Sequence, residues 1–107
     1  MTEETRGWCR NLIEAGRLEP GEDVLVIVDE PLTVQGSQFA DAVKQAGGRP
    51  RLELWAGQSR PLAHPPPGVV EGAKEATFCV FLSQDPIGAE ANARFEVMER
   101  LADHGGR

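Results

Sequence analysis

The chain has 107 residues, of which 40% are hydrophobic and 26% charged, and its formal net charge is -6. This composition is typical of a folded domain with one buried core. The negative charge disfavours binding to nucleic acid or anionic lipid. No apolar run approaches the ~20 residues that span a membrane, and the acidic start Met1–Glu4 is unlike a signal peptide. We expect a single α/β domain over residues 1–107 that is cytoplasmic and binds neither nucleic acid nor membranes.

The first predicted elements are a helix over residues 3–17 and a strand over residues 23–29. The helix has an apolar face at helical spacing, made of Trp8, Cys9, Leu12 and Ile13. The strand is an unbroken, β-branched-rich apolar run, which is typical of a parallel strand buried on both faces. Asp29 and Pro31 follow it, and they predict a helix that Asp29 caps and that carries Pro31 in its first turn.

A second helix and a second strand follow. The helix ends at Gly47-Gly48, a natural left-handed terminus. Its predicted apolar face comprises Val34, Phe39, Ala40, Val43 and Ala46. In the strand at 50–55, Leu52 and Leu54 alternate with charged residues, which predicts an edge position.

The second half of the chain repeats the pattern after an irregular connector over residues 56–67. The triple proline Pro65–Pro67 gives that connector a stiff, extended end, and a short helix is expected at 68–76. Residues 77–83 form a second fully apolar strand, which leads into Gln84-Asp85-Pro86. The last helix, at 86–103, is expected to turn four residues inward: Phe95, Met98, Leu101 and Ala102.

These elements predict a three-layer, Rossmann-like or flavodoxin-like parallel sheet with helices on both faces. Right-handed crossovers and the two buried strands give the strand order 2-1-3. Ligands of such sheets bind beyond the carboxyl ends of the strands, at the switch point between the first and third strands. The polar residues expected to gather there are Asp29, Glu30, Ser83, Gln84 and Asp85.

This cluster has two interpretations. The carboxylates could hold a divalent cation or an amine-bearing ligand, or form a carboxylate pair that works as an enzyme. Alternatively, Asp29 and Asp85 cap helices that begin with proline, which has only a structural role. Cys9 and Cys79 stand in no ligand spacing, and no phosphate-binding or nucleophile motif occurs. We therefore assign no catalytic residue and no metal ligand.

Three segments carry a resemblance to a known family. They are the run Leu18–Pro31, the run Ala46–Pro50, and the triple proline that precedes an apolar strand. In these segments the chain resembles the N-terminal domain of the thermophilic, aminopeptidase T-like metallo-aminopeptidases. The resemblance implies a scaffold half that shapes a substrate cleft and contributes to dimer contacts. It also implies two divalent metal ions in another domain, whose ligands match no residue here, so this chain itself would hold no cofactor.

We therefore expect a non-catalytic scaffold or oligomerisation domain of an aminopeptidase T-like protein. The alternative is a stand-alone module that binds a small ligand or cation through the acidic strand ends, and an independent enzyme using Asp29 and Asp85 is a third possibility. The strand at 77–83 is apolar, and no later strand is predicted to cover its outer edge. An open edge of this kind is a template for pairing, so we expect a homodimer or a partner chain there.

Overall fold

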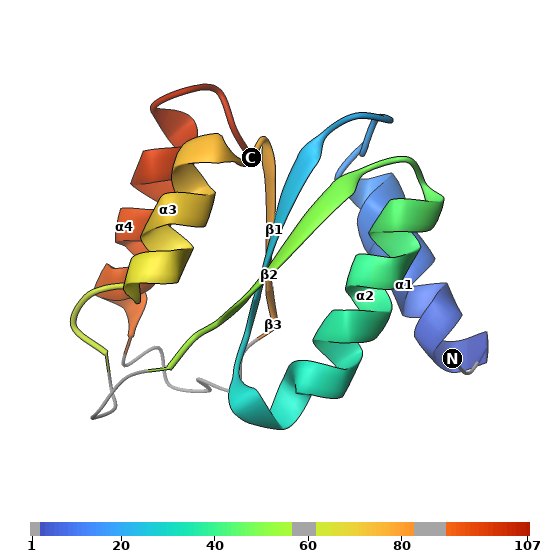
Figure 1. Cartoon of the computed structure of the whole chain (residues 1–107), viewed down its shortest axis with the longest axis horizontal. Coiled ribbons are helices and arrows are strands. Elements are labelled where there is room, and N and C mark those ends of the chain that lie inside the picture. The colour runs from blue at the N-terminus through green and yellow to red at the C-terminus, as the bar shows by residue number, and fades with distance from the viewer. Residues whose placement is uncertain (1–2, 57–61, 83–89) are drawn as a thin grey trace.

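In the computed structural model, which describes residues 3–56, 62–82 and 90–107, three parallel strands form a central sheet with two of the described α-helices on each face (Figure 1). In chain order the elements are α1 (Glu3–Ala15), β1 (Asp23–Val28), a 3-10 turn η1 (Glu30–Leu32), α2 (Thr33–Gln45), β2 (Arg49–Leu54), α3 (Pro67–Glu75), β3 (Phe78–Leu82) and α4 (Ala91–Ala102). The strand order is β2-β1-β3, with Val24 opposite Pro50 on one side and Phe78 on the other. The predicted α/β sheet is confirmed.

β1 lies at the centre of the fold and is buried on both faces. Leu25 and Ile27 belong to the core between the sheet and the helices α3 and α4. Val24, Val26 and Val28 belong to the core on the other face, with α1 and α2. Each of the five residues from Val24 to Val28 therefore needs an apolar side chain, which explains why the run does not alternate.

The helices α1 and α2 pack together on one face of the sheet. The rings of Trp8 and Phe39 are stacked with centroids 5.9 Å apart, and Cys9 is buried. Gly36 lies where an added methyl group would meet Val28 and Leu52, so the missing side chain lets α2 approach the sheet closely. After α2 the chain turns at Gly47 with a φ of 91°, the left-handed conformation expected there.

β2 is an edge strand, as its alternation predicts. The amides of Arg49 and Trp55 donate to the carbonyls of Glu22 and Val28, respectively. The backbone N–H and C=O groups of the odd-numbered residues of β2 therefore point towards β1. By alternation the nitrogen of Pro50 faces the outer side. A proline fits this position because no ladder hydrogen bond is lost there.

Two predicted helix faces are wrong in part. On α2, Phe39 and Val43 are buried as predicted, and Ala40 and Ala46 are partly buried, but Val34 is 67% exposed. On α4 the buried residues are Ala93, Val97 and Leu101, whereas Phe95 is 64% and Met98 44% exposed and Ala102 is exposed too. Of the four inward positions expected on α4, only Leu101 is confirmed. Periodicity identified apolar helices but not which apolar residues the three-stranded sheet covers.

The outer edge of β3 is covered at its start by the last residue of the chain. The amide of Arg107 donates to the carbonyl of Thr77 at 3.0 Å, and the amide of Cys79 donates to the carbonyl of Arg107 at 2.7 Å. This is the bonding pattern of a parallel strand one residue long. The expectation that nothing from this chain covers the edge is therefore wrong at its first residues.

Candidate functional site at the carboxyl edge of the sheet

Only part of the predicted site lies in the described structure. Asp29 directly follows β1 and is 3% exposed, while Glu30 lies in η1 and is exposed. Ser83, Gln84 and Asp85 lie outside the described residues, so their predicted gathering with Asp29 stays a prediction.

Asp29 occupies the predicted cap position without using its carboxylate as the cap. It precedes η1, and Pro31 lies in the first turn as expected, but no side-chain cap hydrogen bond forms. The turn is held by its backbone, since the amide of Leu32 donates to the carbonyl of Asp29 at 2.9 Å. The hydroxyl of Thr33 donates to the carbonyl of Glu30 at 2.7 Å. The prediction that the Asp29 carboxylate caps the following helix is therefore wrong.

A second buried carboxylate, Glu90, was not found from the sequence. It is 2% exposed and directly precedes α4. Its Oε2 accepts a hydrogen bond from the backbone amide of Leu62 at 2.6 Å, and its Oε1 accepts one from the indole Nε1 of Trp55 at 3.2 Å. Glu90 therefore joins the end of β2, the segment before α3 and the start of α4. The available signal was Trp55 itself, because a buried indole N–H needs an acceptor.

Aromatic and cationic groups lie around these acids. The rings of Trp55 and Phe81 meet edge to face with centroids 5.5 Å apart. The guanidinium carbon of Arg94 lies 5.7 Å from the Phe81 ring centre. Because the extended backbone of Asp29 continues the alternation of β1, its side chain points to the same face of the sheet, that of α3 and α4. The carboxyl edge therefore combines two buried acids, one arginine and two aromatic rings.

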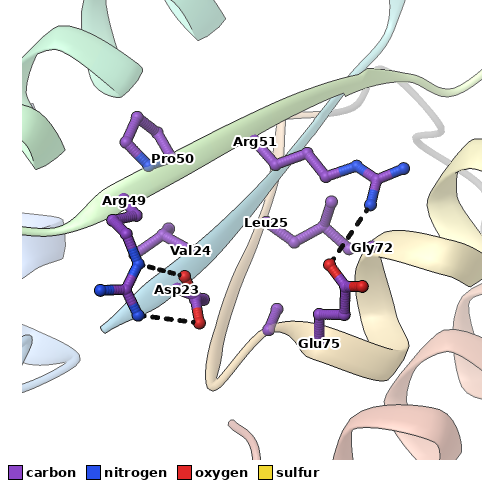
Figure 2. Close-up of a pocket in the computed structure, with 9 residues that line it drawn as sticks. Asp23, Val24, Leu25, Arg49, Pro50, Arg51, Gly72 and Glu75 are labelled. Carbon is purple, nitrogen blue, oxygen red and sulfur yellow. Dashed lines mark hydrogen bonds and ion pairs between the residues drawn. The ribbon is translucent and has the colours of Figure 1, made fainter. Parts of the chain in front are cut away.

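A hollow with a mixed charged lining lies at the opposite edge of the sheet. It has a volume of about 440 Å³ and lies between β1, β2 and α3 (Figure 2). Arg49 binds both carboxylate oxygens of Asp23, at 2.7 and 3.1 Å, and lowers the pKa of that carboxyl. Arg51 lies 3.8 Å from Glu75 across the hollow. These charges neutralise one another, and ligands of parallel sheets bind at the carboxyl ends, not at this edge.

A bidentate ion pair joins Glu22 and Arg107. The guanidinium Nη1 and Nη2 donate to Oε1 and Oε2 of Glu22 at 2.6 and 2.9 Å. The same side chain donates to the carbonyls of Gly16 and Arg17, each at 3.0 Å, and stacks on Phe78. The hydrogen bonds from Arg107 lower the pKa of Glu22 to about 2. This contact ties the turn after α1 to the end of the chain and has an architectural role.

The cysteines and histidines have no catalytic arrangement among the described residues. Burial raises the pKa of Cys9 and raises that of Cys79 to about 12, so both thiols stay protonated at neutral pH. His64 lies 3.3 Å from Glu96 at the surface, and His104 contacts the carbonyl of Ala73. Within the described ranges, no group of three or more metal-ligating side chains occurs. None of the described helices is both long and apolar enough to cross a membrane.

The described sheet and helices have a Rossmann-like α/β fold. Comparisons with protein-family models, with curated proteins and with solved structures found no match.

Proposed function

We propose that this chain is a non-catalytic scaffold or oligomerisation domain, of the kind that the N-terminal domain of aminopeptidase T-like metallopeptidases provides. In that plan the two divalent metal ions and their ligands belong to another domain. The described acids support this reading, because Glu22 and Asp23 are bound by arginines and Glu90 accepts two internal hydrogen bonds. These carboxylates hold the fold together.

The outer edge of β3 is the observation that carries the proposal. The backbone carbonyl of Leu82 accepts a hydrogen bond from the amide of Asp29, so the backbone polar groups of Leu82 point towards β1. By alternation, the backbone amide and carbonyl of Phe81 point to the outer side of β3. Among the described residues, only Arg107 pairs with this edge, at Thr77 and Cys79. Within the described ranges, the outward amide and carbonyl of Phe81 have no backbone partner, and a strand from another chain would pair there. Strand addition is a common way for a protein to bind a partner through a sheet edge.

Amide hydrogen exchange tests this proposal. In dilute protein, the Phe81 amide should exchange quickly, whereas the amides of Val80 and Leu82 should exchange slowly because they face β1 or its end. These two neighbours are matched controls in the same strand. A Phe81 amide that is as slow as its neighbours in dilute monomer would mean that the edge is already covered, and the scaffold proposal would fail.

A second candidate function is favoured by the buried acids Asp29 and Glu90. A module that binds a small cation or an amine at the carboxyl edge would use carboxylates such as that of Asp29, which is buried directly after β1. Calorimetric titration with Mg²⁺, Mn²⁺ and ethylamine tests this function. Binding should be lost in Asp29→Asn and kept in Asp41→Asn, a control on the exposed face of α2. Binding that is absent, or equal in the two variants, excludes this candidate.

A further inference from the structure

Residues 105–107 form a strap that leads from the turn after α4 to the start of β3 (Figure 1). The strap turns at Gly105, which has a φ of 81° and open space around it. At its far end, the amide of Arg107 donates to the outward carbonyl of Thr77, and the carbonyl of Arg107 accepts from the outward amide of Cys79. The strap therefore occupies the groups that a neighbouring strand would use at the start of β3.

One side chain holds the strap in place. The guanidinium of Arg107 donates to both carboxylate oxygens of Glu22, at 2.6 and 2.9 Å. It also donates to the carbonyls of Gly16 and Arg17, each at 3.0 Å, and it lies 5.3 Å from the centre of the Phe78 ring. The strap is thus fixed to the turn between α1 and β1 as well as to β3.

The strap can open while the core stays folded. Gly105 and Arg107 are exposed, and the side chain of Arg107 keeps 44% of its surface in solvent. The other two strap residues are glycines, so opening breaks hydrogen bonds and an ion pair but uncovers little apolar surface. Segments with few buried apolar contacts open at a lower free energy than the whole domain. The pairing of β3 with β1 does not involve the strap and persists when it leaves.

We propose that residues 105–107 are a reversible strap on the β3 edge and that the ion pair between Glu22 and Arg107 is its latch. In the closed state, Arg107 excludes any other strand from Thr77 and Cys79. In the open state, the outward groups of these two residues are available to a strand from another chain. This inference rests on the proposed strand-accepting edge and adds its regulation.

Amide hydrogen exchange in dilute monomer measures the opening. The Cys79 amide donates to Arg107 and reports on the strap, whereas the Val80 amide faces β1 and reports on the sheet. In Arg107→Ala, the Cys79 amide should exchange at least about tenfold faster relative to the Val80 amide, because the charged hydrogen bonds of the latch are lost. In the wild type, low urea should accelerate the Val80 amide and leave the Cys79 amide nearly unchanged, since a local opening exposes little surface.

Arg49→Ala is the matched control. Arg49 also binds both oxygens of a carboxylate, that of Asp23, at the same end of the sheet, but these bonds do not involve the strap. This variant should leave the ratio of the two exchange rates unchanged. Glu22→Gln weakens the latch from its other side and should act in the same direction as Arg107→Ala. Circular dichroism confirms that the three variants fold.

Aggregation tests what the strap does for the edge. Arg107→Ala and Arg49→Ala are compared by light scattering, each at the urea concentration that gives the same folded fraction. Arg107→Ala should aggregate faster, because an uncovered strand edge is a template for pairing. Equal rates would refute the action of the strap on strand pairing.

The strap itself is refuted if the Cys79 amide is no faster in Arg107→Ala than in Arg49→Ala, or if it follows the Val80 amide at every urea concentration. The scaffold proposal fails by a different result, protection of the Phe81 amide in the dilute monomer. A chain in which the Phe81 amide exchanges quickly and the Cys79 amide does not respond would thus reject the strap while the strand-accepting edge stands.

Discussion

Separating Glu22 from Arg107 should remove a pH-dependent part of the stability. The pKa of Glu22 falls from 4.5 to about 2 in the folded chain. Because a pKa change of one corresponds to 1.36 kcal/mol, the full lowering would contribute about 3 kcal/mol to the free energy of unfolding. The side chain of Arg107 is 44% exposed, so solvent screening reduces the contribution. We expect Glu22→Gln to lower the free energy of unfolding by about 1 to 2 kcal/mol at pH 7.

The sign of the pH dependence follows from the lowered pKa. The contribution is fully present above pH 4.5, the ordinary value for the unfolded chain, and is lost as the pH falls towards 2. The stability difference between wild type and Glu22→Gln should therefore shrink over this interval and vanish near its lower end. Other carboxylates titrate in both proteins, so their effects cancel in the difference.

Urea unfolding from pH 2 to pH 7 provides the assay, and a double-mutant cycle with Arg107→Ala isolates the pair. The coupling energy should be about 1 to 2 kcal/mol at pH 7. The exposed pair Lys74 and Glu71 is the control, and its coupling should stay below about 0.5 kcal/mol. A coupling no larger than the control, or a stability difference independent of pH, would refute the reasoning.

Three further predictions concern activity, the carboxyl edge and helix packing. If the proposed scaffold function holds, in which the metal ligands belong to another domain, the purified chain should not hydrolyse a chromogenic leucine substrate with added zinc, cobalt or manganese; turnover that Asp29→Asn abolishes would contradict this. Trp55→Phe should cost about 1 to 3 kcal/mol in urea unfolding, since it leaves the buried Oε1 of Glu90 without the indole donor; a cost no greater than that of the exposed change Val34→Ala would speak against that role. Gly36→Ala should cost about 1 to 3 kcal/mol, because its methyl group meets Val28, whereas Gly7→Ala has open space and should be neutral or stabilising; equal effects of the two changes would show that α2 can shift without penalty.

Local sequence signals predicted the strands and their order. β1 and β3 are apolar at almost every position, and this pattern is needed only where helices cover both faces of a parallel sheet. Charged residues in β2 marked the edge, and the structure adds that Pro50 turns its nitrogen outward. Gly47 marked the end of α2, and the triple proline marked the start of α3, although the helix spans Pro67–Glu75 and not the predicted 68–76.

The contacts of the carboxyl edge could not be predicted in the same way. Trp55 and Glu90 are separated by 35 residues, and no spacing rule relates an indole to a carboxylate at that distance. The exposure of Phe95 and Met98 on α4 could not be predicted for a similar reason. Its spacing shows that Phe95 and Met98 are apolar, but not that the sheet ends at β3 beneath the helix.

The position of β1 between two later strands has a consequence for folding during synthesis. Asp23 binds Arg49, which follows 26 residues later, and its carbonyl binds Thr77, which follows 54 residues later. As the chain emerges from the ribosome, β1 therefore has an edge without its native partner until β3 has been made. Such non-local pairing folds slowly, and an apolar strand with an unpaired edge is prone to aggregate. We expect chaperone dependence and aggregation of nascent chains to be greatest before residue 82 has left the ribosomal tunnel.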